Sequence, residues 1–405
     1  MSDLKVAIVG GGIGGLVLAL ALRERGVSLE VYEQADELRE IGAAVALSAN
    51  GTRELRRLGV ADQVEAVSVV PSALVIRRWD TGEIIADHPI GRDGVYEATF
   101  AAPYYGLHRV ALLQALADAL TGEGLNLGRR CVGVEEYPAG AELRFADGTT
   151  ATADIVIGAD GVHSVIRPYV AGNVRGRFSG TIGYRGLVAI EDIPSLADPT
   201  PLQFWAGPGR HLLHYAIDGG RTINFLAVVR VPEWTNEAWM QPCAVSDAVD
   251  AFAGWHPAVT EMIGAPETGA RWALHDLKPL ARWHTDRVVL IGDAAHAMVP
   301  HQGQGANQTI EDAVVLADCL TDARAADHPA RALDQYAARR RKRTIAVQWL
   351  SRRTADLMHL PDGPEIAPRD ALFAGLYSEL AWIHSHDTQD DAEHTSPIGA
   401  ASGPT

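Results

Sequence analysis

The chain has 405 residues, of which 47% are hydrophobic and 21% are charged. This balance is typical of a globular protein, and the length exceeds what a single core comfortably supports, so we expect two domains. A net charge of −16 disfavours nucleic acids and anionic membrane surfaces as partners. No stretch is predicted to span a membrane, and residues 4–22 are too rich in glycine for a targeting segment.

The cysteines indicate a cytoplasmic protein without a structural metal. Cys131, Cys243 and Cys319 lie far apart and match no metal-ligand spacing. Widely spaced cysteines in an odd number are typical of reduced thiols in the cytoplasm. We therefore expect cytoplasmic localisation and no metal site.

The first strong motif occupies residues 5–33. The apolar run 6–9 predicts a buried parallel strand, residues 16–25 predict a helix, and residues 28–32 predict a second strand. Three glycines between the first strand and the helix have G-x-G-x-x-G spacing: Gly10, Gly12 and Gly15. Such glycines permit a tight turn, close approach of a pyrophosphate, and close packing of helix on strand.

Glu33 ends the second strand, where an acid can accept hydrogen bonds from ribose hydroxyls. The whole stretch therefore predicts a dinucleotide site, for either FAD or NAD. The alternative is a glycine-rich turn without a ligand.

Two further apolar runs, 155–157 and 288–291, predict buried strands with polar residues after their ends. Asp160 follows the first run and Asp293 follows the second. Ligands bind at the carboxyl ends of strands in open α/β sheets, so Asp160 is a candidate site residue. Arg109 starts a predicted helix and therefore favours a nearby anion, although a solvated arginine is the simpler alternative.

The middle of the chain has a different pattern. Short β-rich runs separated by Pro-Gly and Gly-Gly fill residues 178–231 and predict an antiparallel sheet. A hairpin is predicted over 73–79 and 83–88. Residues 330–357 predict a long helix, and the polar end of the chain predicts a frayed tail.

Three motifs in this order carry a resemblance. They are the glycine motif with Glu33; the sequence Gly158-Ala159-Asp160-Gly161 with Ser164 and Arg167; and Gly292-Asp293-Ala294-Ala295-His296 with Pro300 and Gly303-Gln304-Gly305. Together they resemble the FAD-dependent aromatic hydroxylases, the group A flavoprotein monooxygenases, over about residues 4–385. Within that family the chain is most similar to the salicylate and hydroxybenzoate hydroxylases.

The resemblance implies an α/β fold with a Rossmann-type FAD-binding domain and a second, largely antiparallel substrate domain. The FAD-binding domain is expected over 1–72, 103–177 and 271–330, and the substrate domain over 73–102 and 178–270. A C-terminal helical region is expected over 331–387, with a flexible tail over 388–405.

The resemblance also implies which residues hold FAD. The expected set is Gly10, Gly12, Ile13, Gly14, Gly15, Glu33, Ala44, Val45, Arg109, Val132, Asp160, Asp293, Gly305, Ala306 and Asn307. The glycines would hold the pyrophosphate, Asp293 the ribityl chain, and the amides of residues 305–307 the flavin edge. Two departures affect the flavin edge: Gly42-Ala43-Ala44 stands for the usual Gly-Ala-Gly, and Ala49-Asn50 for Pro-Asn.

The implied reaction consumes NADH or NADPH and O₂, and hydroxylates a phenolic ring through a flavin C4a-hydroperoxide. A phenol has a pKa of about 10, so a base is needed, and histidine suits the task. His211 and His214 share one predicted strand but face opposite sides of it. We favour His214, with Tyr215 beside it; an ordinary strand histidine is the alternative. Pro300 and Gln304 are expected beside the flavin and substrate.

The substrate is expected to be a small aromatic acid. The leading hypothesis is salicylate, giving catechol; 3-hydroxybenzoate and a bicyclic or heteroaromatic phenol are alternatives. Another chemistry on the same scaffold, or a flavin-binding module without turnover, also remains open. A homodimer is compatible with the sequence.

Overall fold

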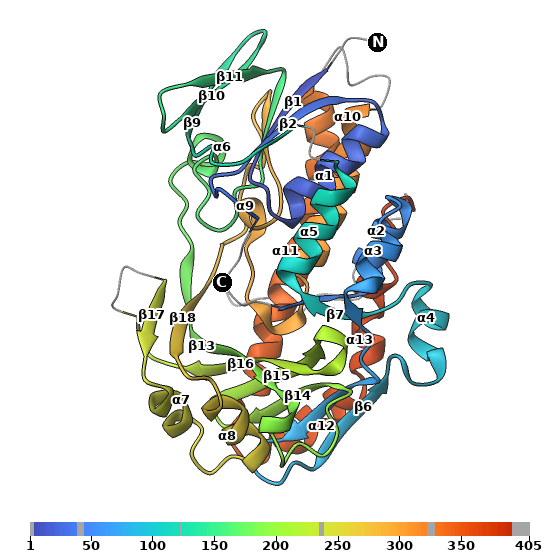
Figure 1. Cartoon of the computed structure of the whole chain (residues 1–405), viewed down its shortest axis with the longest axis vertical. Helices are drawn as coiled ribbons and strands as arrows, with labels where there is room; N and C mark the ends of the chain where they lie inside the picture. The colour runs from blue at the N-terminus through green and yellow to red at the C-terminus, as the bar shows by residue number, and fades with distance from the viewer. Residues whose placement is uncertain (1–3, 39–43, 122–123, 235–238, 322–328, 391–405) are drawn as a thin grey trace.

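A computed structural model describes residues 4–390 except for 39–43, 122–123, 235–238 and 322–328. A parallel five-stranded sheet and a large mixed sheet lie toward opposite ends of the long axis (Figure 1). None of the helices in these residues is long and apolar enough to cross a lipid bilayer. The tail beyond residue 390 lies outside the described residues.

The parallel sheet has the order β19-β12-β1-β2-β8. Its strands are β1 (Lys5–Val9), β2 (Ser28–Tyr32), β8 (Leu125–Asn126), β12 (Ile155–Gly158) and β19 (Val288–Leu290). The apolar runs predicted from the sequence thus become adjacent strands, although they are far apart in the chain. Their buried side chains join one large core with the helices α1 (Ile13–Glu24), α5 (Arg109–Ala119) and α10 (Gly305–Thr321).

The large sheet has eight strands in the order β17-β18-β13-β16-β15-β14-β5-β6. They are β5 (Ala73–Arg78), β6 (Ile84–Pro89), β13 (Arg177–Ala189), β14 (Leu202–Gly207), β15 (Arg210–Ile217), β16 (Thr222–Arg230), β17 (Met240–Cys243) and β18 (Gly269–Asp276). All neighbours are antiparallel except β14 and β5. The predicted hairpin and the predicted β-rich region are therefore confirmed as parts of one sheet.

Two smaller antiparallel sheets complete the strands. One contains β9 (Cys131–Tyr137), β10 (Gly140–Phe145) and β11 (Thr150–Ala153). The other has the order β3-β7-β4, with β3 (Ala44–Leu47), β4 (Ser68–Val69) and β7 (Tyr105–His108). This second sheet connects the region of the glycine motif with the large sheet, because Gly106 of β7 packs on Tyr215 of β15.

The remaining helices pack on the core of the parallel sheet, pack on the large sheet, or lie between the two. They are α2 (Ala49–Arg57), α3 (Ala61–Ala66), α4 (Val95–Phe100), α6 (Arg167–Ala171), α7 (Val245–Ala251), α8 (Pro257–Gly264), α9 (Asp293–His296), α11 (Pro329–Met358), α12 (Ile366–Ala374) and α13 (Leu376–His384). One face of the large sheet packs on α7 and α8, and the opposite face packs on α12, α13 and β3. The predicted long helix 330–357 is α11.

Two predicted boundaries need correction. Residues 271–276 were assigned to the FAD-binding domain, but they lie in β18, which pairs with β13 and β17 of the large sheet. The tail was expected from residue 388, but Thr388 is buried and its carbonyl accepts a hydrogen bond from Arg339. Asp387 beside it forms two hydrogen bonds with Arg57 of α2, so this segment is packed on the molecule.

Candidate active site

The glycine motif forms the turn between β1 and α1, and each glycine meets a different constraint. A side chain at Gly10, where φ is +110°, would collide with the backbone of Ala159 at 2.4 Å. A Cβ at Gly15 would lie 1.9 Å from the carbonyl oxygen of Gly10, so only glycine lets α1 pack this closely on β1. Gly12 instead faces open space, with no atom within 4 Å of its Cβ position.

The open space at Gly12 fits a pyrophosphate. Gly12 is the N-cap of α1, no side chain caps this helix end, and its first turn has no acid. The free amides and the helix dipole therefore favour an anion beside Gly12, Ile13 and Gly14. Gly14 also packs α1 against Thr309 of α10, which brings the two helix N-termini together.

Glu33 lies at the end of β2, as expected. Its carboxylate accepts hydrogen bonds from the amides of Gly11, at 2.7 Å, and Ala35, at 2.9 Å. The Gly11 contact fixes the acid beside the glycine turn. The backbone of Arg129 also bonds the carbonyl of Glu33, so the chain leading to exposed Val132 on β9 runs past the same acid.

Two acids follow strands of the parallel sheet. Asp293 is exposed at the first position of α9, directly beyond β19. Asp160 lies beyond β12, and one of its carboxylate oxygens accepts the amide hydrogens of Val165 and Ile166. Burial raises the pKa of Asp160 above its usual range. Its capping role is thus established, and its second oxygen has no hydrogen-bond partner in the described part of the chain.

The predicted flavin-edge residues converge around β3 and the N-terminus of α10. Ala44 and Val45 begin β3, which pairs with β7, and Arg109 directly follows β7 as the first residue of α5. No atom lies within 4 Å of the Cβ position of Gly305, so α10 begins beside open space at its first residue. Gly42 and Ala43 fall outside the described residues.

Asn307 fixes this geometry from behind. Its side chain accepts from the Ser48 amide at 3.0 Å and donates to the carbonyls of Ala46 and Gly303 at 3.1 and 2.8 Å. It therefore ties the β3 loop to α10 through its side chain, while its backbone belongs to the first turn.

Gln304 does not behave as a substrate-contacting residue. It is 2% exposed, its amide donates to Ser48 Oγ at 2.9 Å, and its carbonyl oxygen accepts from Asn50 and Gln308. These bonds occupy the side chain within the protein. The placement argues against the predicted position of Gln304 beside the substrate.

A buried ionic cluster lies behind Gln304. Glu311 bonds Arg340 and Arg343 of α11, and Asn50 donates to it at 2.6 Å. Asp312 bonds Arg340 at 2.7 Å and His296 at 2.5 Å, and accepts the amide of Gly292 at 3.0 Å. The cluster thus connects α11, α10 and the loop that carries Asp293.

Burial opposes ionisation of these two acids, but their partners outweigh it. Burial alone would raise the pKa of Glu311, whereas Arg343 and Arg340 bring it well below the usual range. Burial would also raise the pKa of Asp312, but His296 and Arg340 outweigh this effect, so its pKa is lowered. Both carboxylates are therefore charged at neutral pH.

The two strand histidines lie on opposite faces of β15, as the strand period predicts. Leu212 and Ala216, which flank His214 at alternate positions, pack in the core against α7 and α8. His214 therefore faces away from the segments predicted to hold the flavin, namely β3 with the residues up to Asn50 and residues 300–307, which we call the flavin loops. Neither of its ring nitrogens has a hydrogen-bond partner in the described residues. Burial and Arg77 lower its pKa to about 3. This placement argues against the favoured base, His214.

His211 lies on the other face, toward the flavin loops. Its Nε2 lies 3.3 Å from Nδ1 of His301, which follows Pro300 in a 3₁₀ turn (Pro300–Gln302) between α9 and α10. Its Nδ1 lies 2.7 Å from Nε2 of His359, just after α11. Tyr215 shares this face and packs on Gly106, and burial raises the pKa of its hydroxyl.

Sequence reasoning missed His301 and His359. His301 directly follows Pro300 and precedes Gly303, both residues of the third motif, and this position was a usable signal. His359 lies in no motif and comes to His211 only through the path of α11, so no local pattern could have identified it.

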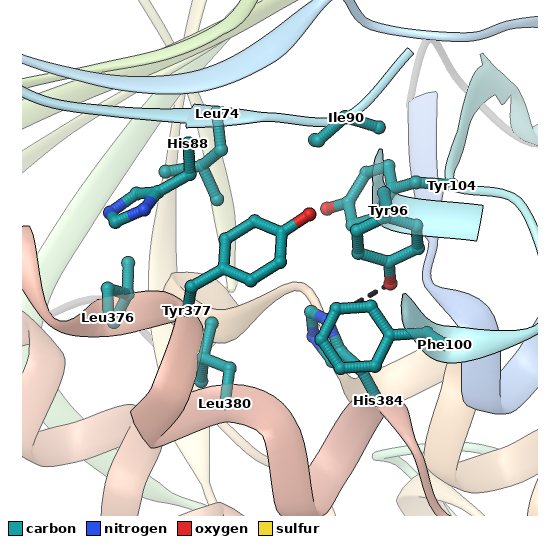
Figure 2. Close-up of a pocket in the computed structure, with 10 residues that line it drawn as sticks. All are labelled: Leu74, His88, Ile90, Tyr96, Phe100, Tyr104, Leu376, Tyr377, Leu380 and His384. Atoms are coloured by element: carbon teal, nitrogen blue, oxygen red, sulfur yellow. Dashed lines mark hydrogen bonds between the residues drawn. The ribbon is translucent and has the colours of Figure 1, made fainter. Parts of the chain in front are cut away.

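An aromatic cavity adjoins the flavin loops. Its lining residues are Leu74, His88, Ile90, Tyr96, Phe100, Tyr104, Leu376, Tyr377, Leu380 and His384 (Figure 2). Tyr104 connects it with the loop at Gly303, because its hydroxyl lies 4.0 Å from the Cβ position of that glycine. The hydroxyl of Tyr96 bonds Nδ1 of His384 at 3.0 Å (Figure 2). It also accepts the amide hydrogen of Ala49, at 3.0 Å.

The Ala49 contact explains one departure from the family pattern. A proline at this position has no N–H to donate. Here the N–H is present, buried and satisfied by Tyr96. Ala49 is the first residue of α2, a position that proline also tolerates.

Four features mark the candidate dinucleotide site: the N-termini of α1 and α10, Glu33 at the end of β2, and the exposed Asp293 beyond β19. The chain belongs to the family described as "FAD binding domain", whose model matches residues 3–350. It is an FAD-dependent aromatic monooxygenase.

The relatives extend over nearly the whole chain. A 3-amino-4-hydroxybenzoate 2-monooxygenase of Streptomyces cremeus is 42% identical, with 94% of this chain and 95% of the relative covered. A salicylate hydroxylase of Pseudomonas putida is 34% identical, with 98% and 96% covered. A solved salicylate hydroxylase substrate complex superimposes with a TM-score of 0.82 at 30% identity, covering 96% of both chains.

Proposed function

We propose that this enzyme hydroxylates 3-amino-4-hydroxybenzoate at C2, consuming a reduced nicotinamide nucleotide and O₂. The observation that carries the proposal is the buried His211–His301 pair on the sheet face that meets the flavin loops. The 42% identity with the Streptomyces cremeus enzyme supports the choice of ring. Salicylate remains the second candidate, supported by a relative at 34% identity and a structural match at 30%.

The residues present fit FAD in named roles. Gly12, Ile13 and Gly14 would hold the pyrophosphate at the N-terminus of α1, and Glu33 the adenosine ribose. Asp293 would bond the ribityl chain, and the first turn of α10 would face the flavin edge. Bound FAD supplies electron transfer from the nicotinamide and delivery of one oxygen atom to the ring.

The protein must help the ring donate electrons to the attacked carbon. In 3-amino-4-hydroxybenzoate the amine is ortho to C2; in salicylate the hydroxyl is ortho to the attacked carbon. As electron density leaves this donor group, its N–H or O–H proton becomes acidic and needs an acceptor. His211 and His301 are neutral acceptors, because burial lowers the pKa of both, to about 3 for His301.

The burial of these imidazoles also excludes water from the reacting ring. His211 is 1% exposed and His301 is 3% exposed. Tyr215, on the same sheet face as His211, would pack against the ring, and Pro300 would border it from the flavin side. A dry pocket limits wasteful reduction of O₂ without hydroxylation.

A panel of ring acids tests the proposal. FAD-loaded enzyme is mixed with NADH or NADPH and with 3-amino-4-hydroxybenzoate, salicylate, 3-hydroxybenzoate or benzoate, and substrate-dependent oxidation is measured with product mass. The expected result is one added oxygen atom on 3-amino-4-hydroxybenzoate. Conversion of salicylate to catechol alone would favour the second candidate, and no product from any acid would refute both.

A further inference from the structure

One carboxylate oxygen contacts both ends of the short helix α9. Oδ2 of Asp312, on α10, accepts the backbone N–H of Gly292 at 3.0 Å, immediately before the first residue of α9. The same oxygen lies 2.5 Å from Nε2 of His296, the last residue of α9. Between these two contacts lies Asp293, the exposed acid of the candidate dinucleotide site. Asp312 itself is buried, so water does not compete for either bond.

The backbone of Gly292 has fixed partners on both sides. Its N–H donates to Asp312, while its carbonyl accepts the N–H groups of Ala295 at 2.9 Å and His296 at 2.8 Å. At this residue φ is +58°, and a Cβ would lie 2.7 Å from Oγ1 of Thr309 on α10. The direction in which the chain enters α9 is therefore set by its contacts with α10.

The other oxygen of Asp312 is also occupied. Oδ1 accepts a hydrogen bond from Nε of the buried Arg340, on α11, at 2.7 Å. This bond fixes the plane of the carboxylate and leaves Oδ2 directed at α9. The ring of His296 lies against Trp283, with 5.3 Å between the ring centroids, so this partner has little freedom to move.

The middle of α9 is held from the opposite direction. Arg167, a residue of the second motif, donates to the carbonyl of Ala294 at 3.2 Å and to that of Val162. Of the four residues of α9, Asp293 alone is exposed. The helix is thus restrained at its ends by Asp312 and at its centre by Arg167, and it presents one acid outward.

We propose that Asp312 is a positioning residue for FAD, which holds Asp293 where its carboxylate meets the hydroxyls of the ribityl chain. This inference rests on the ribityl contact given under the proposed function. It adds that α10 sets two cofactor contacts together: its first turn faces the flavin edge, and its Asp312 places the ribityl acceptor. The two contacts therefore keep a fixed separation.

A positioning role differs from a contribution to stability alone. If Asp312 acts through Asp293, its replacement should weaken FAD binding only while the acid at position 293 is present. A contribution that is independent of Asp293 would change the affinity by the same factor whether or not that acid is present. Double-mutant cycles measure this difference directly.

The test compares four proteins: the parent, Asp293→Ala, Asp312→Asn and the double variant. Each is freed of FAD, and its affinity for added FAD is measured by titration, with thermal unfolding to show that the apoprotein is folded. Asp312→Asn keeps the size of the side chain but removes its charge and one acceptor oxygen. In the parent background it should weaken FAD binding by no more than Asp293→Ala does, about ten- to a hundredfold. In the Asp293→Ala background it should change the affinity by less than about twofold.

Glu311→Gln is the matched control. Glu311 is the neighbouring buried acid and also bonds Arg340, but its other hydrogen bonds in the described part of the chain run to Asn50, Gln308 and Arg343 and not to α9. It should change FAD affinity by the same factor with and without Asp293→Ala.

His296→Gln is the second variant if Asp312→Asn does not fold. It removes the ring at the end of α9 while Asp312 keeps Gly292 and Arg340 as partners. It should show the same dependence on Asp293, with a smaller factor.

Two results would overturn the positioning role: equal factors for Asp312→Asn in both backgrounds, or the same coupling to Asp293 in Glu311→Gln. Parental FAD affinity in Asp293→Ala would instead refute the ribityl contact of the proposed function, and this inference with it.

Discussion

The backbone N–H of Ala49 donates a hydrogen bond to the hydroxyl of Tyr96, 3.0 Å away, and this hydroxyl bonds the ring of His384. All three groups are buried. The bond therefore joins the start of α2 to α4 and α13, three elements that come from distant parts of the chain.

The first prediction is a coupling between residues 49 and 96. Tyr96→Phe leaves the Ala49 N–H buried without a partner, which should lower the free energy of unfolding by about 1–3 kcal/mol. Ala49→Pro removes the same N–H at a helix position suited to proline. In the Ala49→Pro background, Tyr96→Phe should lower the free energy of unfolding by clearly less than it does in the parent protein. Additive losses in chemical denaturation would contradict the coupling.

The second prediction separates the two strand histidines. His211→Ala should lower hydroxylation by about 10²–10⁴-fold, the range for loss of a general base, while FAD binding is retained. His214→Ala should have a smaller effect that follows stability alone, since this ring faces α7 and α8. The measurement is product formation at saturating substrate for both variants. A larger loss in His214→Ala would restore the original hypothesis.

The third prediction concerns the pyrophosphate. Gly12→Val adds a side chain where no protein atom lies within 4 Å, so the protein should fold but lose its yellow cofactor. Gly15→Ala should damage the fold itself, because its Cβ would lie 1.9 Å from the carbonyl oxygen of Gly10. Flavin absorbance and thermal unfolding together distinguish these outcomes. A normal flavin spectrum in Gly12→Val would place the pyrophosphate elsewhere.

The fourth prediction assigns the ribityl contact. Asp293→Ala removes an acceptor, and a hydrogen bond to a charged group contributes about 1.5–3 kcal/mol. FAD affinity should therefore fall by about ten- to a hundredfold. Asp286→Ala is the control, because Asp286 is an exposed acid that lies before the amino end of β19, whereas Asp293 lies beyond its carboxyl end. Equal affinities of the two variants in a titration with FAD would count against the contact.

The fifth prediction concerns the ionic cluster. Arg340→Met leaves Glu311 and Asp312 buried with fewer partners, and breaking a buried pair costs about 3–5 kcal/mol of unfolding free energy. Lys342→Met, at an exposed position on the same helix, should change little.

The cost of Arg340→Met should also depend on pH. The pKa values of Glu311 and Asp312 are lower in the folded protein than in the unfolded chain. Ionisation of these carboxylates therefore stabilises the folded state fully above the unfolded-state pKa values of about 4, and this stabilisation is lost as pH falls from there toward the lower folded-state pKa values. The difference between variant and parent should therefore shrink from pH 6 to pH 3. A constant difference would show that the carboxylates are not responsible.

The sequence predicted the elements whose pattern is local. The runs at 6–9, 155–157 and 288–291 are apolar throughout because they are buried on both faces, and all three became neighbouring strands. The spacing of Gly10, Gly12 and Gly15 likewise reports a local turn. The period of β15 correctly separated His211 from His214 onto opposite faces.

The sequence could not show which face of β15, that of His211 or that of His214, borders the candidate site. The answer depends on which layer covers each face, and α7, α8 and the turn at His301 are all distant in sequence. Gln304 was assigned to the substrate for the same reason: its neighbours Ser48 and Asn50 come from another part of the chain. Strand β18 was placed in the wrong domain because its partner β13 begins almost a hundred residues earlier.

The order of strands in the parallel sheet has a consequence for synthesis. Its central strand, β1, is made first, but its edge strand β19 ends at Leu290. The large sheet is inserted between them, and contacts across such sequence distances slow folding. While the ribosome is still translating the large sheet, β12 lacks its outer neighbour β19 and α1 lacks its packing partner α10, so their apolar side chains stay uncovered until residues 288–321 emerge. We therefore expect a pause or truncation upstream of β19 to yield an aggregating chain, even though the glycine motif is already complete.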